Sequence, residues 1–553
     1  MLLVAGLLLA AAPATAQAPR ADVVRLAFPQ YDGGLTPYTF ELGYPLMTLV
    51  YDTLMWRDEQ GVPRPWLARS VQRSRGGRRI TVRLRSDARW HDGRPVTAQD
   101  VAFTLRRLTS RSHPRFTPQL TDVRAIAVTD RLTTTIDLRR PSLGFEDQPL
   151  ADVPILPRHL WSELPVGRRA PAGLAVGSGP YRLTSAGRRE GYVLRANDQY
   201  FRGTPRVREL RVPILGDLQK TFDALRARDI DMVPLSLAER DADRLAATLG
   251  IGVRRGPSYV GTSLLLNLRS APFDDPRARR AVAAALELPR IARNVAPARA
   301  AVGGFVHPAS RWAAAEPVHT ADVPAARRAL SALRLPTIRV LAPEQDPVRV
   351  EAGRQVVLAL RRAGAAATLV ELPSAQLGKA IGEDGSPPRF EAAITSITPL
   401  VSHDPDYLRA LFGSAPAAAP LNLAGYRSAA FDTAARRVAD ARTVPARRAA
   451  VAEELRLLAR DAPAIPLFFS DGAFAFRSEI YDGWTFMKGS GILDKRSLLP
   501  GATAAPASEE PAAEPAADQR SGDGLSLVNV VSLVLLGGIA LLGVYALVQR
   551  RRT

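Results

Sequence analysis

The sequence predicts an α/β protein with two or three lobes, and three observations support this fold class. The chain has 553 residues, 46% of them hydrophobic and 23% charged. At about 100–200 residues per domain, this length exceeds what one hydrophobic core serves. Short β-rich runs alternate with amphipathic helical segments from residue 21 to residue 499. The second half also contains the pattern of a β-α-β unit.

The β-α-β pattern gives the strongest prediction of secondary structure. We expect a strand over 337–341, an amphipathic helix over 347–363 that ends at Gly364, and a strand over 367–372. A further strand is expected over 391–397. Because the crossover between such strands is right-handed, they form a parallel sheet with helices on its faces.

The first half has shorter alternating runs that are typical of antiparallel hairpins. Alternation predicts strands over 23–28, 78–90 and 130–138. Thr97 is a plausible N-cap of the helix that follows the second strand. Asp100 places a negative charge in the first turn of that helix, where the helix dipole favours it.

Composition and missing motifs exclude several classes of function. The chain has no cysteine, which removes disulfides, cysteine nucleophiles, thiolate zinc sites and iron–sulfur clusters. The 74 basic and 54 acidic residues leave a net charge of +20. The arginines are scattered without interleaved aromatic residues, so we expect no nucleic-acid partner. We find no nucleotide-binding P-loop, serine-hydrolase elbow or zinc-protease motif. No enzyme activity, metal or cofactor is therefore expected.

The two ends of the chain predict export and a membrane anchor. Residues 1–16 combine an apolar run with a small-residue cleavage site, which predicts a signal peptide; a buried N-terminal helix is the alternative. Residues 525–548 carry no charge and would span about 36 Å as a helix, enough to cross a bilayer. A buried helix is the alternative there. The basic tail 549–553 is expected in the cytoplasm, and 500–524 form a Pro/Ala-rich linker.

Residues 51–108 resemble the extracytoplasmic solute-binding proteins of peptide and nickel ABC transporters. The match centres on WHDGRPVTAQDV, where Trp90 replaces the usual Phe. The matching residues are His91, Asp92, Gly93, Pro95, Thr97, Ala98, Asp100 and Val101. Further blocks follow in the family's order at 177–183, 195–214, 224–234, 265–286, 390–408 and 425–437. The resemblance covers about residues 22–490, and it implies that the WHDG loop is scaffold rather than ligand pocket.

The resemblance implies a two-lobed, periplasmic-binding-protein-like fold of the large type with an extra subdomain. Lobe I would comprise 21–264 with the inserted subdomain, completed by 468–499, and lobe II would comprise 265–467. Strands near 263–267 and 465–469 would cross between the lobes. Such proteins close on a solute like a hinge and deliver it to ABC permease and ATPase subunits.

The resemblance also suggests a ligand site around one short segment. The candidate residues are His403, Asp404, Asp406 and Tyr407. In peptide-binding relatives an aspartate of this segment receives the ligand's ammonium group, and Asp404 is the first candidate for that role. The alternative is that these carboxylates cap backbone amides at a helix start. Thr398, Pro399 and Leu400 stand where the family often has tryptophan and glycine, so the solute class stays open.

Aromatic residues after the first strand are the second group of candidates. Tyr38, Phe40 and Tyr44 fall where family members line the cleft, and they could form an apolar wall. Simple core packing is the alternative. The many arginines do not allow one to be chosen from sequence as a carboxylate partner.

These inferences lead to a membrane-tethered, extracytoplasmic solute-binding protein of an ABC importer. The expected ligand is a peptide or a similar small polar solute. A tethered solute sensor that signals through a membrane partner is the first alternative, and an exported hydrolase is the second.

Overall fold

A computed structural model describes most of the chain between residues 20 and 500. The described residues are 20–38, 43–110, 113, 115–164, 175–216, 218–234, 236–237, 239–295, 298–344, 346–416, 419 and 421–500. The expected signal peptide, the linker from residue 501, the membrane helix over 525–548, the basic tail and Phe40 lie outside them. Among the residues that are described, no helix has the length and apolar character needed to span a bilayer.

A four-stranded sheet carries the N-terminal strand. Its order is β1 (Ala21–Arg25), β10 (Val207–Val212), β9 (Gly191–Ala196) and β8 (Tyr181–Gly187). β1 pairs parallel to β10, and the other pairs are antiparallel. Helix α1 (Tyr44–Val50) buries Leu46 and Leu49 in the core that Val24 and Leu194 share. This packing holds the start of α1 against the sheet.

A second four-stranded sheet is antiparallel throughout and lies in the part of the chain for which an inserted subdomain is predicted. Its order is β4 (Ala68–Ser74), β5 (Arg79–Leu84), β7 (Thr133–Leu138) and β6 (Val123–Val128). Helix α2 (Ala98–Ser110) covers it, with Val101 and Leu105 buried beside Trp90. The hairpin of β2 (Met55–Arg57) and β3 (Pro63–Pro65) precedes this sheet.

Two predicted strands of the first half are shorter than expected. The strand predicted over 78–90 ends at Leu84, because the chain then folds into a turn in which the amide of Trp90 donates to the carbonyl of Arg94 (2.8 Å). The strand predicted over 130–138 begins only at Thr133. There Asp130 accepts a hydrogen bond from the amide of Leu132 (2.8 Å) and closes the preceding turn.

The second half contains a six-stranded mixed sheet. Its order is β12 (Ala298–Ala300), β16 (Ala464–Arg477), β11 (Ile251–Leu266), β15 (Ala392–Ile397), β13 (Ile338–Pro343) and β14 (Ala367–Leu372). The predicted β-α-β unit is confirmed as β13 (Ile338–Pro343), α9 (Pro347–Arg362) and β14 (Ala367–Leu372), with β13 and β14 parallel. β15 (Ala392–Ile397) lies parallel to β13 on its other side. Val340 is buried in a core to which α9 contributes on one face, and Leu341 is buried in a core to which α10 (Ser374–Ile381) contributes on the other, so helices cover both faces.

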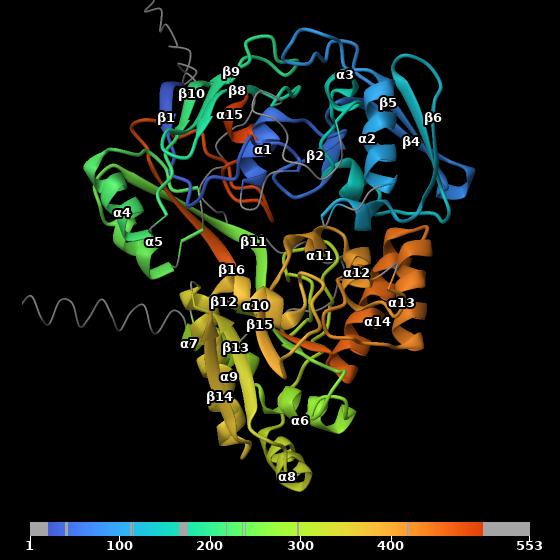
Figure 1. The fold of residues 1–553 in the computed structure, drawn as a ribbon, viewed down its shortest axis with the longest axis vertical. Helices are drawn as coiled ribbons and strands as arrows, with labels where there is room; N and C mark the ends of the chain where they lie inside the picture. The colour runs from blue at the N-terminus through green and yellow to red at the C-terminus, as the bar shows by residue number, and fades with distance from the viewer. Residues whose placement is uncertain are drawn as a thin grey trace, which may run out of the picture. The chain divides into compact units, whose positions relative to one another are not determined.

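Two long strands connect the halves of the molecule. β11 (Ile251–Leu266) and β16 (Ala464–Arg477) pair antiparallel along their length, with a register shift between Pro257 and Gly261. Figure 1 shows them running from the blue and green part of the ribbon into the six-stranded sheet. The crossing strands expected near 263–267 and 465–469 fall on these longer strands.

The remaining elements are short and connect or cover the sheets. In the first lobe they are η1 (Arg75–Gly77), η2 (Thr117–Leu120), η3 (Glu146–Leu150), α3 (Arg158–Trp161), α4 (Leu218–Ala227), α5 (Glu239–Ala246) and α15 (Lys495–Leu498). In the second lobe they are α6 (Pro276–Ala285), α7 (Leu288–Val295), β12 (Ala298–Ala300), α8 (Val323–Leu333), α10 (Ser374–Ile381), α11 (Pro399–His403), η4 (Pro405–Tyr407), α12 (Leu408–Phe412) and α13 (Ala429–Asp440).

Candidate functional site

The WHDG loop joins two segments of the first lobe. The His91 Nδ1 atom accepts from the amide of Gly177 (3.3 Å), so its Nε2 atom donates to the carbonyl of Gly179 (3.0 Å). Burial lowers the pKa of His91 to about 4, which keeps the ring neutral. The loop therefore connects two of the sequence blocks that support the family resemblance, as expected of a scaffold element.

A cavity of about 170 Å³ lies between the two lobes, and we call it the central cavity. Its first-lobe wall includes Tyr44 of α1, Arg57 of β2, and Asp152. Its second-lobe wall is α11, which begins where Thr398 accepts a hydrogen bond from the amide of Leu400 and ends at His403. Residues 487–494 contribute to the remaining wall. Elements that are far apart in the sequence thus enclose one small chamber.

Asp152 is the best-satisfied charge in the central cavity. Its Oδ1 atom accepts from the Tyr44 hydroxyl (2.8 Å) and Arg115 Nη2 (2.7 Å), and its Oδ2 atom accepts from Arg115 Nε (3.1 Å) and Gln119 Nε2 (2.7 Å). Burial alone would raise the pKa of Asp152, but the charge and hydrogen bonds of Arg115 lower it to about 2. The carboxylate is ionised and already has four donors.

Arg57 projects from the end of β2 and also lines the central cavity. It donates from Nη1 to the carbonyl of Ala151 (3.3 Å) and from Nη2 to the carbonyl of Asp147. Its Nε atom is buried, and none of the described residues accepts a hydrogen bond from it. Within the described part of the chain, Arg57 forms no ion pair.

His403 contributes a neutral ring from the second lobe. It is 6% exposed, and its ring lies 5.2 Å from that of Tyr259, centroid to centroid. Burial lowers the pKa of His403 well below its usual range, and the charge of Arg57 lowers it further. Its side chain makes no hydrogen bond to any other residue that the structure describes.

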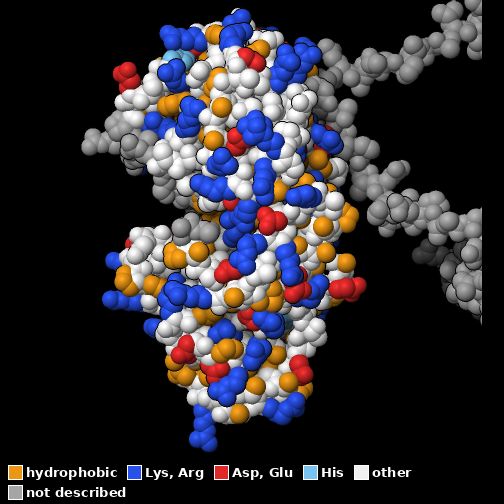
Figure 2. Space-filling model, turned by 90° about the vertical axis from the view of Figure 1, so that its right-hand side faces the viewer, with side chains coloured by type: hydrophobic (Ala, Val, Ile, Leu, Met, Phe, Trp, Pro, Cys, Tyr) orange, Lys and Arg blue, Asp and Glu red, His pale blue; other side chains and the backbone are white. Residues whose placement is uncertain are grey.

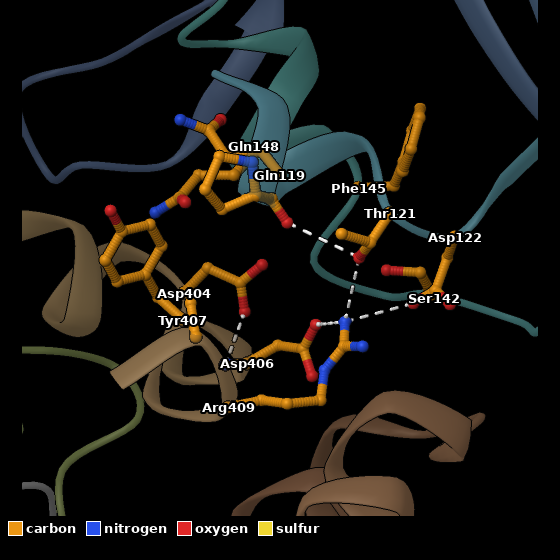
Figure 3. Close-up of a pocket in the computed structure, with 12 residues that line it drawn as sticks. Gln119, Thr121, Asp122, Ser142, Phe145, Gln148, Asp404, Asp406, Tyr407 and Arg409 are labelled. Carbon is orange, nitrogen blue, oxygen red and sulfur yellow. Dashed lines mark hydrogen bonds and ion pairs between the residues drawn. The ribbon is translucent and has the colours of Figure 1, made fainter. Parts of the chain in front are cut away.

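The other candidates of the predicted segment, Asp404, Asp406 and Tyr407, lie outside the central cavity. With Arg409, Thr121 and Asp122 they form what we call the interlobe polar cluster (Figure 3). Asp404 accepts from the amide of Asp406 (3.1 Å), capping η4, and pairs with the buried Arg447. Asp406 pairs with Arg409 (3.0 Å), and burial raises the pKa of Tyr407 to about 12. The cap considered as an alternative is thus present at Asp404, while ligand contact by Asp404 stays a prediction.

Arg409 also reaches across to the first lobe. Its Nη2 atom lies 3.1 Å from Asp122 Oδ2 and 3.4 Å from Thr121 Oγ1. Figure 3 draws both contacts as dashed lines. The free volume of the cluster is about 30 Å³, so it holds little besides its own side chains. Through these contacts of Arg409, the charged groups of the cluster connect the lobes.

The aromatic candidates Tyr38 and Tyr44 lie in different surroundings. Tyr44 lines the central cavity, whereas Tyr38 packs against the rings of His113 (5.4 Å) and Trp161 (5.6 Å). The Arg107 guanidinium lies 5.9 Å from the Tyr38 ring. Phe40 is outside the described residues.

Comparison with known proteins places the chain in a family. The profile of the bacterial extracellular solute-binding proteins, family 5 Middle, matches residues 62–419. The chain belongs to this family. Its members are solute-binding proteins rather than enzymes, and the family supports an extracytoplasmic body for this solute-binding protein.

The relatives and solved structures agree with this assignment. A candidate ABC transporter peptide-binding protein of Brucella ovis is 25% identical over 313 residues, 55% of this chain and 57% of the relative. The matched part thus spans little more than half of that relative. Two structures share the two-lobed fold: NikZ from Campylobacter jejuni with Ni(L-His) and AppA from Bacillus subtilis with a nonapeptide. Their TM-scores are 0.72 and 0.73, at 20% and 18% identity. They cover 83% and 86% of this chain, and 94% and 98% of their own chains.

Sequence reasoning missed two further lobe-crossing contacts of this solute-binding protein. Asp147 of η3, 1% exposed, pairs with Arg311, and Gln148 Nε2 donates to the carbonyl of Leu400 (2.8 Å). Burial raises the pKa of Asp147 to about 6 although Arg311 opposes the shift. No local pattern marks these residues, because their partners lie more than 150 positions away.

Arg447 and Glu454 were also missed, but here a signal exists. Both are buried on α14 (Val444–Asp461), Arg447 four positions before the apolar residue Val451 and Glu454 three positions after it. Charged residues within the apolar stripe of a helix indicate a buried ion pair or network. Among the described residues, no group of three or more histidines and carboxylates is arranged to hold a metal ion.

Proposed function

We propose that this protein is the membrane-tethered, extracytoplasmic solute-binding component of an ABC importer. It captures a peptide or a similar small polar solute by lobe closure and delivers it to a permease. The observation that carries the proposal is the central cavity, which both lobes enclose. Relatives of this fold hold a nonapeptide in AppA and Ni(L-His) in NikZ, so both solute classes are candidates.

The proposal includes an assignment of the parts of the chain. The signal peptide is 1–16, lobe I is 21–264 completed by 468–499, and lobe II is 265–467. The linker 500–524 and the helix 525–548 tether the body, and 549–553 are the cytoplasmic tail. Tethering would keep the concentration of the binding protein high beside its permease.

The proposed ligand contacts come from both groups of candidates. The residues are Tyr38, Phe40, Tyr44, His403, Asp404, Asp406 and Tyr407. Tyr44 and His403 have the best support, because they line the central cavity. Asp404 has a weaker claim, because Arg447 already neutralises it.

Thermal unfolding of the full-length protein tests the proposal. The probes are dipeptides, oligopeptides, nickel–histidine chelates and neutral sugars. A ligand at a hundred times its dissociation constant adds about 2.7 kcal/mol, which is expected to raise Tm by a degree or more. Absence of a shift with every probe contradicts the proposal, as does hydrolysis of the peptides.

The variant Asp404→Ala tests the first candidate of the predicted segment. Its Tm should fall even without ligand, because Arg447 would be left buried without its partner. The informative quantity is therefore the ligand-induced shift. Asp275→Ala is the matched control, since Asp275 caps α6 in the same lobe. A shift that persists in Asp404→Ala removes Asp404 from the ligand site and leaves the proposed function intact.

A further inference from the structure

Tyr259 of the crossing strand β11 has an unusual backbone conformation. Its φ is 62°, in the left-handed region. Among the described non-glycine residues with positive φ, Tyr259 is the one that lies inside a strand, while the others lie in loops or turns or at the ends of helices. A left-handed backbone brings Cβ too close to the following carbonyl oxygen, so it is unfavourable for an aromatic residue. The contacts of Tyr259 must therefore hold this conformation.

Tyr259 lies within the register shift between the two crossing strands. Three residues of β11, 258–260, face one residue of β16, Ser470, and we call them the crossing bulge. The Ser258 hydroxyl donates to the carbonyl of Ser470 (2.7 Å) and holds the crossing bulge against β16. Because residues 258–260 take no part in the register of either neighbouring strand, their φ and ψ can change without loss of ladder hydrogen bonds. A rotation of one lobe against the other can be absorbed there.

The ring of Tyr259 packs against the second lobe, behind the wall of the central cavity. Its side chain is buried, and its ring centroid lies 5.2 Å from that of His403 and 5.0 Å from that of His307. Its hydroxyl donates to the carbonyl of Ala309 (3.2 Å). Of these partners, His403 lines the central cavity. One side chain thus connects the crossing bulge to the cavity wall.

The C-terminal part of the first lobe encloses the same ring from another side. Gly489 lines the central cavity, and its amide donates to the carbonyl of Pro257, just before the crossing bulge (2.9 Å). A Cβ atom added at Gly489 would lie 2.7 Å from Tyr259 Cδ2 and 2.6 Å from His403 Cε1. Tyr259 is therefore enclosed by a cavity residue of each lobe. Separation of the lobes would open this enclosure and allow the crossing bulge to relax.

We infer that Tyr259 is a positioning residue that sets the balance between the open and closed forms. It takes the left-handed conformation in the closed form, and opening of the lobes returns it to an extended one. This inference rests on the proposed function and adds how closure is regulated. Because the strained backbone opposes closure, it lowers the apparent affinity and favours release of the solute. A solute that contacts His403 and Gly489 stabilises the enclosure from the cavity side.

Tyr259→Gly and Tyr259→Ala test the inference as a matched pair. Both remove the ring, but glycine adopts the left-handed conformation freely and alanine does not. Calorimetric titration of the full-length variants with dipeptides, oligopeptides and nickel–histidine should show about fivefold to thirtyfold tighter binding by the glycine variant. Small-angle scattering without solute should give it the smaller radius of gyration. Ala462→Gly is the control, because Ala462 has a φ of 45° at the end of a helix within the second lobe, and its affinity should be unchanged.

The outcomes separate this inference from the proposed function. If the glycine and alanine variants bind solute equally, the left-handed conformation is present in both forms, so the inference is wrong and solute binding stands. If no probe binds any of the proteins, the proposed function is wrong, and equal radii of gyration of the two variants overturn the inference as well. Should Tyr259→Ala fail to fold, as judged by circular dichroism, Tyr259→Asn and Tyr259→Ser replace the pair, because asparagine adopts the left-handed conformation more readily than serine. Equal affinities in that pair have the same meaning.

Discussion

At the scale of single residues, burial of a titratable ring makes the stability of this protein depend on pH. His91 lies between Gly177 and Gly179 with both ring nitrogens hydrogen-bonded. In an unfolded chain a histidine has a pKa near 6.5. In the folded protein burial lowers the pKa of His91 to about 4. Between these two values the unfolded chain binds more protons than the folded one.

We therefore predict that His91 removes stability as the pH falls from about 6.5 to about 4. Its contribution is complete above pH 6.5, and the loss amounts to roughly 3 kcal/mol when the folded pKa is reached. His91→Asn keeps a donor and an acceptor but does not titrate. Urea unfolding of both proteins at several pH values measures the difference, and the slope should be shallower in the variant.

The wild type is compared with His91→Asn because other groups of the protein titrate in the same pH range. The pKa of Asp147 is raised to about 6, so its effect on stability has the opposite sign. Its contribution to the stability of the protein is complete below about pH 4 and is lost as the pH rises through about 6. Equal slopes in wild type and His91→Asn would contradict the prediction.

At the scale of elements, the backbone at Gly144 in the first lobe approaches α11 and η4 in the second. This approach determines how closely the lobes meet. Gly144 precedes η3 of the first lobe, and a Cβ atom added there would fall well inside van der Waals contact of the Asp404 carboxylate. Asp404 cannot easily move aside, because it caps η4 and pairs with Arg447. Only a glycine allows this approach.

We predict that Gly144→Ala weakens solute binding by about tenfold or more with little change in Tm. The methyl group would hold the lobes apart while the core of each lobe keeps its packing. Titration with a ligand found by thermal unfolding measures the affinity. Gly303→Ala is the control, since a Cβ atom there meets nothing within 4 Å. Unchanged affinity in Gly144→Ala would show that closure does not use this contact.

At the scale of the whole described body, charged and polar groups connect the lobes. The pairs are Arg409 with Asp122 (3.1 Å), Arg311 with Asp147, and Gln148 with Leu400 (2.8 Å). Contacts that exist only in the closed form add to the apparent affinity for a solute that stabilises that form.

Arg409→Ala is predicted to weaken solute binding by about threefold to tenfold, as expected for a partly shielded ion pair. Small-angle scattering should show a smaller closed fraction at equal ligand saturation. Arg460→Ala is the matched control, because Arg460 pairs with its neighbour Asp461 within one lobe (2.7 Å). If both variants bind alike, the lobe-crossing pair does not stabilise closure.

The remaining arginines are spread over the molecule rather than gathered at one site, as their scattered positions in the sequence suggest. Figure 2 shows basic side chains spread over the drawn face with acidic ones among them. Many form local pairs, such as Arg79 with Asp137 (2.7 Å) and Arg339 with Glu391 (2.8 Å). Pairs that are at least partly exposed to solvent contribute little to stability.

The sequence alone determined the α/β class, the β-α-β unit to within two residues, and the family blocks, because hydrophobic period and turn residues act over short distances. It also brought His403 and Tyr44 forward as candidates. Only the tertiary structure placed these two at one cavity and paired Asp404 with Arg447. Charge balance in a cavity depends on side chains that the fold brings together from distant segments, and no local pattern encodes it.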